Sequence, residues 1–111
     1  MPKQHRLSSA DLKRLRPEKR LHGALFSLSI TRDTPPVARI ACAVSKKVAL
    51  RANVRNAIKR RARNAIRSIL PSFPTGYAYV FNAKREAVNA SYTEIKKDIE
   101  SLAHKCGSVI K

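Results

Sequence analysis

The stretch ANVRNAIKRRARNAIRSIL, residues 52–70, decides the fold because its apolar residues recur at the spacing of an α-helix. These residues lie one, three or four positions apart and predict one buried stripe: Val54, Ile58, Ala62, Ala65, Ile66 and Ile69. Pro71 and Pro74 follow directly and cannot continue a helix. We therefore predict a central helix that packs one face against the rest of a small domain and ends at Leu70.

Two alternating segments precede this helix and predict strands. In residues 24–31, apolar side chains alternate with serine and threonine, and the turn signal at residues 33–36 separates this segment from residues 37–44. The two apolar faces consist of Phe26, Leu28 and Ile30 in the first segment and Ala38, Ile40, Cys42 and Val44 in the second. We expect the two strands to pair as an antiparallel hairpin.

Three further segments complete the order of elements. Residues 8–16 predict a short helix that Pro17 ends, and residues 77–82 predict a strand. The strand carries Tyr77, Tyr79 and Phe81 on one face, and the pattern leaves open whether this face is core or a platform for stacking bases.

The last helix begins at Ser91, where Ser91 and Glu94 form a capping box ahead of a stripe of apolar residues. That stripe consists of Ile95, Ile99, Leu102 and Cys106. The order helix, strands, helix, strand, helix predicts a single α+β domain over residues 1–111, built as a two-layer sandwich, with residues 1–7 and 107–111 as flexible ends.

The composition points to a polyanionic partner. The chain has 111 residues, with 24 Lys and Arg against 7 Asp and Glu, and a formal net charge of +17. Its hydrophobic fraction of 43% is high enough for a folded core. Because so much like charge repels itself in a compact state, we expect a nucleic acid to neutralise it in use.

Cysteine content and the N-terminal sequence favour a cytoplasmic protein. Cys42 and Cys106 are the two cysteines, and Cys42 lies in an apolar run typical of a buried strand, so we expect no disulfide. The first 20 residues are rich in Lys and Arg and contain no apolar run of the kind that directs export. The longest uncharged stretch, residues 68–83, is broken by two prolines and a glycine and is too short to span a bilayer as a helix.

The positive charge is concentrated on one face of the central helix. Residues 34–85 contain twelve Lys and Arg and no acidic residue. One side of the predicted helix carries Asn56, Lys59, Arg60, Arg63 and Arg67. A solvated helix face normally mixes acids with bases, whereas this face suits backbone phosphates. If about five phosphate contacts form, the logarithm of affinity falls with the logarithm of salt with a slope of about −3.5 to −4.5.

The sequence offers no protein-only active site. Its acids are scattered, and His5, His22 and His104 have no metal-ligand spacing with the cysteines. A ribosomal or other structural RNA-binding protein is the main alternative, and a DNA-binding protein is a second, although no helix-turn-helix pattern is present. Phe26 stays open between a core role and a surface role.

Two motifs resemble the protein subunit of bacterial ribonuclease P. Residues 44–47 read VSKK, and residues 55–63 read RNAIKRRAR, where that family typically has R-N-R-x-K-R-x-x-R on its central helix. The resemblance extends over nearly the whole chain. It implies a left-handed βαβ crossover, like that of one ribosomal-protein domain, and a short first strand near residues 17–22. It also implies a catalytic RNA as partner and precursor tRNA as substrate, with Mg²⁺ held mainly by the RNA and the substrate.

The resemblance also assigns site residues. The RNA-binding set combines the basic face with matched motif positions: Lys46, Lys47, Arg51, Arg55, Asn56, Lys59, Arg60, Arg61, Arg63 and Arg67. A cleft for the 5′ leader of the substrate is assigned to Leu12, Phe26 and Ser29.

The chain departs from the family pattern at Ala57, where arginine is usual, at Asn64, where an acid is usual, and at Leu12, where phenylalanine is common. We expect Arg61 or Arg51 to compensate for the arginine that is absent at position 57.

Overall fold

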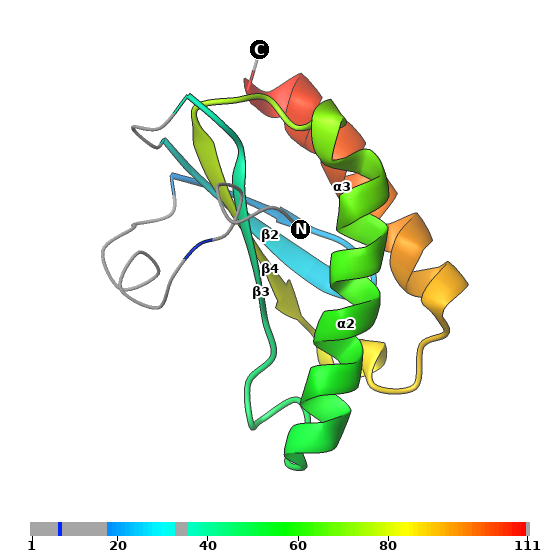
Figure 1. Ribbon diagram of the computed structural model, residues 1–111. Helices are drawn as coiled ribbons and strands as arrows, with labels where there is room; N and C mark the ends of the chain where they lie inside the picture. Colours follow the sequence, from blue (N-terminus) through cyan, green and yellow to red (C-terminus); the bar gives the residue numbers. More distant parts are fainter. Residues whose placement is uncertain (1–6, 8–17, 33–35, 111) are drawn as a thin grey trace.

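The computed structural model describes residue 7, residues 18–32 and residues 36–110, and shows two long helices packed on one face of a sheet (Figure 1). The strands are β1 (Lys19–His22), β2 (Phe26–Arg32), β3 (Arg39–Ala43) and β4 (Tyr77–Ala83), and the long helices are α2 (Ala52–Ile69) and α3 (Tyr92–Ile110). Two single 3₁₀ turns, η2 (Leu70–Ser72) and η3 (Arg85–Ala87), flank β4. The α+β two-layer sandwich is confirmed, and so is the first strand that the resemblance implied.

The strand order, β1-β2-β4-β3, shows that the predicted hairpin of residues 24–31 with residues 37–44 is wrong. The last strand in sequence, β4, lies between β2 and β3. It pairs antiparallel with β2, with Leu28 opposite Phe81, and parallel with β3, with Ile40 opposite Tyr79. Alternation identifies strands and their faces, but the neighbour of each strand depends on which apolar surfaces pack together over long range.

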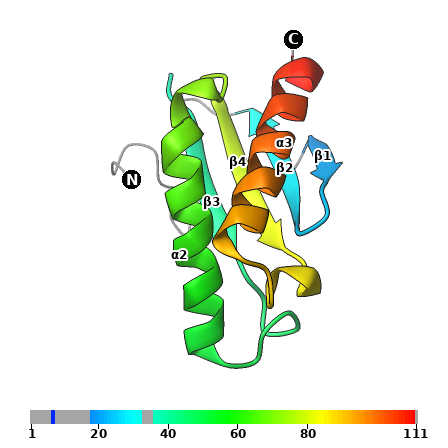
Figure 2. The ribbon, with the colours of Figure 1, turned by 90° about the vertical axis from the view of Figure 1, so that its right-hand side faces the viewer.

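The connection from β3 through α2 to β4 is a βαβ crossover of the less common hand. In Figure 2 the two parallel strands run downward behind α2, with β3 to the left of β4, which makes the crossover left-handed. Nearly all such connections in proteins are right-handed. The structure thus agrees with the implied handedness and places α2 across the edge of the sheet where β3 lies.

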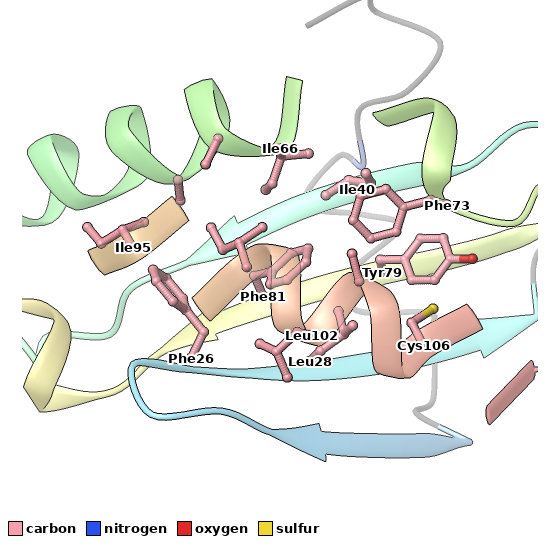
Figure 3. Packing of buried hydrophobic residues seen from close by; sticks show 14 of the residues in the cluster. Phe26, Leu28, Ile40, Ile66, Phe73, Tyr79, Phe81, Ile95, Leu102 and Cys106 are labelled. Carbon is pink, nitrogen blue, oxygen red and sulfur yellow. The ribbon is translucent and has the colours of Figure 1, made fainter. Parts of the chain in front are cut away.

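The core lies between the sheet and the two long helices (Figure 3). Phe26, Leu28, Tyr79 and Phe81 are fully buried, and the ring of Phe73 packs against Tyr79 with a centroid separation of 5.0 Å. The capped stripe of α3 and four residues of the α2 stripe are buried against them: Ile95, Ile99, Leu102, Cys106, Ile58, Ala62, Ala65 and Ile66. The aromatic face of β4 is therefore core and not a stacking platform.

The hydroxyl of Tyr79 donates a hydrogen bond to the carbonyl oxygen of Pro74 at 2.6 Å. Burial raises the pKa of Tyr79, and the neighbouring Cys106 raises it further. This residue therefore joins the core to the segment between η2 and β4.

An acid on α3 holds the turn between β1 and β2. The carboxylate of Asp98 accepts hydrogen bonds from the backbone N–H groups of Ala24, Leu25 and Phe26 at 2.8, 3.0 and 2.9 Å. Gly23 makes room for it, because a Cβ there would lie 2.6 Å from Asp98 Oδ1. The ammonium of Lys84 donates to the Gly23 carbonyl at 2.7 Å, so α3 and the end of β4 both fix this turn.

The predicted capping box of the last helix is confirmed. The N–H of Glu94 donates to Ser91 Oγ at 3.2 Å, and the N–H of Ser91 donates to Glu94 Oε1 at 3.0 Å. The helix continues to Ile110 and so includes most of the segment expected to be a flexible end. The predicted helix at residues 8–16 lies outside the described residues. Among the described helices, none has the length and apolar character required to cross a membrane.

Candidate nucleic-acid interface

The exposed side of α2 is the basic face that the sequence predicts. Ile58, Ala62, Ala65 and Ile66 turn inward and are fully buried. Of the predicted RNA-binding residues on the helix, Asn56, Arg60, Arg63 and Arg67 are exposed, and Arg55, Lys59 and Arg61 are partly buried. The structure thus places four of the predicted RNA-binding residues on the side of α2 away from the core and leaves the other three partly covered.

The sequence of α2 contains no acid to offset this charge. The first turn of α2 contains no acidic residue, and its N-cap, Arg51, makes no side-chain capping bond within the part of the chain that is described. The N-terminal end of a helix is already the positive end of its dipole. The exposed Lys46, Lys47 and Arg51 precede that end and add their charges to it.

Arg55 has a role that helical periodicity could not reveal. Its Nη1 donates hydrogen bonds to the carbonyl oxygens of Ala49 and Leu50 at 2.9 and 2.7 Å. These bonds tie the loop before α2 to the first turn of the helix. A contact between residues five and six positions apart, from a side chain to a loop carbonyl, leaves no repeat in the sequence.

A crevice of about 310 Å³ opens beside the basic face, where β3 and β4 end. Its wall includes Cys42, Ser45, Lys59 and Asn82. Burial raises the pKa of Cys42 to about 11, although the nearby cations Arg63 and Lys59 lower it. Cys42 is therefore a protonated thiol near neutral pH. Cys42 and Cys106 are both free cysteines in the structure.

The leader-cleft assignment requires a correction. Phe26 has no exposed surface and packs in the core beneath the helices, so it cannot stack on a ligand in this fold. Ser29 is three residues further along β2 and thus points to the opposite face of the sheet, where it is 7% exposed. A strand cannot direct both side chains into one cleft. Leu12 lies outside the described residues.

The described part of the chain contains no group of three His, Cys, Asp or Glu side chains placed to hold a metal ion. A small α+β sandwich with a left-handed crossover and an acid-free basic helix face defines the class of protein: a compact domain suited to binding a polyanion.

The comparisons with known proteins identify the family. Over residues 1–107 the chain matches the Ribonuclease P family. A ribonuclease P protein component of Picosynechococcus sp. is 31% identical over 104 residues, which cover 92% of this chain and 90% of that protein. One of Xanthomonas axonopodis pv. citri is 42% identical over 79 residues, which cover 71% of this chain and 52% of that protein. The chain therefore belongs to the ribonuclease P protein family.

Solved structures agree on the fold. A mutant of the Staphylococcus aureus RNase P protein with defective mRNA degradation activity superposes with a TM-score of 0.80 at 20% identity, covering 95% of this chain and 90% of that one. The RNase P protein from Thermotoga maritima superposes with a TM-score of 0.71 at 19% identity, and the match covers 78% of this chain and 82% of that one.

Family membership makes the protein part of a ribonucleoprotein enzyme and implies an RNA partner. A role in tRNA 5′ maturation together with that RNA is consistent with the family.

Proposed function

We propose that this protein binds the catalytic RNA of ribonuclease P through the basic face of α2 and assists that RNA in removing the 5′ leader from precursor tRNA. The observation that carries the proposal is the exposed, acid-free row of Asn56, Arg60, Arg63 and Arg67 on a helix whose other side is core. Guanidinium groups remain charged at any relevant pH and bind phosphate in a fixed geometry. The row therefore supports affinity for a folded RNA backbone, with little reading of base sequence.

In this proposal the chemistry belongs to the RNA. Mg²⁺ prefers carboxylate, phosphate and water oxygens, and among the described residues no acid belongs to α2 or lines the crevice. The residues present do not fit a protein-held Mg²⁺ site, so we assign Mg²⁺ to the RNA and the substrate. The protein contributes positive charge that reduces phosphate repulsion where the two RNA molecules meet.

The test is cleavage of a precursor tRNA at low Mg²⁺ by the ribonuclease P RNA of the same organism, with and without the protein. A variant with Arg60, Arg63 and Arg67 changed to Ala is compared with wild type. Its matched control carries Ala at three exposed cations elsewhere, Arg85, Lys97 and Lys105, so that both variants have the same net charge.

We expect the Arg60, Arg63 and Arg67 variant to lose the stimulation of cleavage. The salt slope of its RNA affinity should become shallower by about 2 to 3, roughly one for each phosphate contact removed, whereas the control should change far less. An equal loss in both variants would show that only net charge matters. RNA binding without stimulation of correct 5′ cleavage would favour a structural RNA-binding role instead.

A further inference from the structure

The loop that joins β3 to α2, residues 45–51, is held in one conformation from both ends. At its start the N–H groups of Val48 and Ala49 donate to the carbonyl oxygen of Ser45 at 3.1 and 3.2 Å. At its end Arg55 Nη1 bonds the carbonyl oxygens of Ala49 and Leu50. Since the guanidinium is a rigid plane, these two bonds fix the peptide groups around Leu50.

This fixed loop turns Leu50 away from the protein. Ala49 is buried and Val48 packs against the core, whereas the Leu50 side chain is 82% exposed. Among the described residues, Tyr92 on α3 is the other large apolar side chain with high exposure, at 41%. The bonds from Arg55 are made to the carbonyl groups of Ala49 and Leu50, which are the backbone groups that set the direction of the Leu50 side chain.

The surroundings of Leu50 specify what could cover it. The exposed Lys46, Lys47 and Arg51 lie in the same loop, and no acid occurs in residues 34–85. A partner at this loop must therefore be anionic and must also offer apolar surface. Folded RNA does both, because unstacked nucleotides in loops and bulges expose base faces and riboses between phosphates.

We infer that Leu50 is an RNA-contacting residue that packs on the base or ribose of an unstacked nucleotide in the partner RNA, and that Arg55 is its positioning residue. The inference rests on the proposed function and adds an apolar contact to it. It also gives Arg55 a different role from the direct RNA contact that the family resemblance implied.

The first test measures the affinity of the full chain for the ribonuclease P RNA of the same organism over a series of salt concentrations. Leu50→Ala should weaken binding about tenfold, because apolar surface that RNA covers is lost. The salt slope should not change, since no cation is removed. Leu50→Met should bind within about twofold of wild type because it keeps the apolar surface. Tyr92→Ala, the matched exposed control, should bind normally.

The second test asks whether Arg55 acts through Leu50. Arg55→Ala should weaken binding by a similar factor with little change of salt slope. The double variant Leu50→Ala, Arg55→Ala should then bind hardly more weakly than either single variant, because both remove one contact. A slope that becomes shallower by about one in Arg55→Ala, with additive losses, would assign Arg55 to a phosphate and overturn its positioning role.

Outcomes for Leu50 separate this inference from the proposed function. Normal RNA affinity of Leu50→Ala, with weakened binding by the Arg60, Arg63 and Arg67 variant, would overturn the Leu50 contact alone. Normal affinity in both would overturn both proposals. If Leu50→Ala instead altered self-association of the protein without RNA, measured by sedimentation, the side chain would contact a second copy and the inference would be wrong.

Discussion

The helices α2 and α3 pack side by side on the same sheet, are of similar length, and differ in almost everything that faces outward (Figure 2). The sequence of α2 contains six Lys and Arg and no acid, whereas that of α3 contains three acids and three lysines. Three cations follow one another in the middle of α2, at Lys59, Arg60 and Arg61. Among the described residues, no side chain caps the first turn of this helix. In α3, two acids form hydrogen bonds within the protein. Glu94 belongs to the capping box with Ser91, and Asp98 accepts bonds from the turn between β1 and β2.

The difference in charge indicates that the two helices have different roles. Acids near the start of a helix and between cations stabilise it, and α3 uses them to stabilise the fold. Without acids in its sequence, α2 gives up that local stabilisation and leaves Arg60, Arg63 and Arg67 exposed. The core beneath both helices supplies the stability that α2 lacks on its own surface.

The largest expected effect comes from removing the acid of α3 that holds the β1–β2 turn. Asp98→Ala leaves three N–H groups without their acceptor and should lower the free energy of unfolding by about 3 kcal/mol, measured by urea denaturation. Asp98→Asn keeps one acceptor oxygen and should lose less. Under conditions where both variants are folded, RNA affinity should stay close to wild type. A loss below about 1 kcal/mol in Asp98→Ala would show that α3 does not stabilise the fold in this way.

The second effect concerns Cys42, beneath the cations of α2. Its pKa is raised from the ordinary 9.0 to about 11, so the folded state favours the protonated thiol. The stability that this provides is complete below pH 9 and is lost as the pH rises toward 11. Between pH 8 and about 10.5, wild type should therefore lose roughly 1 to 2 kcal/mol more than Cys42→Ala in denaturation experiments. Parallel curves for the two proteins would contradict this.

The pKa of Cys42 also responds to the nearby cations Arg63 and Lys59. Because Arg63 lowers the pKa of Cys42, Arg63→Ala should move that pKa further upward. The pH dependence of Cys42 alkylation in the folded protein measures the shift, and Arg85→Ala, on η3, is the control.

A third prediction makes α2 more like α3. Asn56→Glu places an acid four residues before Arg60, which should stabilise the helix by about 0.2 to 0.5 kcal/mol. It also places a negative charge on the surface that we propose binds RNA, and affinity should fall about fivefold, equivalent to about 1 kcal/mol. Asn56→Gln should change neither quantity much. If affinity were unchanged, RNA would not approach this part of the face.

The smallest effect is at the start of α3. Bonds from the Ser91 backbone and side chain lower the pKa of Glu94, so the capping box stabilises the fold above the ordinary pKa of a glutamate and loses this contribution as the pH falls through the lowered value. Ser91→Ala should return the pKa of Glu94 upward, as measured by NMR titration, and should lower the melting temperature slightly at neutral pH. The two melting temperatures should converge in acid. RNA affinity should not respond.

Most of the local structure could be predicted from residue spacing. The apolar stripes of both helices and the apolar faces of β2, β3 and β4 follow from periods of 3.6 and 2, and the structure buries most of these residues. That Phe26 and the aromatic face of β4 belong to the core is decided by the structure. The short β1 has one partly buried residue, Leu21, among exposed residues and therefore shows no such pattern. This strand was predicted by the family resemblance alone.

The candidate site was predictable in its charge and less so in its geometry. Assigning Phe26 and Ser29 to one cleft ignored the alternation of a strand, which separates residues three apart. The bonds from Arg55 to the loop carbonyls and the exposure of Leu50 had no signal in the sequence, because a side chain reaching a backbone oxygen requires no particular residue type there.

Residue spacing alone predicts the apolar faces of the strands and helices, the start of α3, the extent of α2 to within one residue, and the cationic outer face of α2, because these properties depend on neighbours within a few positions of one another. The position of β4 between β2 and β3, the left-handed crossover, and the bonds from Arg55 to the loop that exposes Leu50 are set by the tertiary structure. The strand order and the crossover depend on contacts between apolar surfaces that are far apart in the chain, which residue spacing does not reveal. The bonds from Arg55 are made to backbone carbonyl oxygens, which every residue has, so no residue type marks them in the sequence.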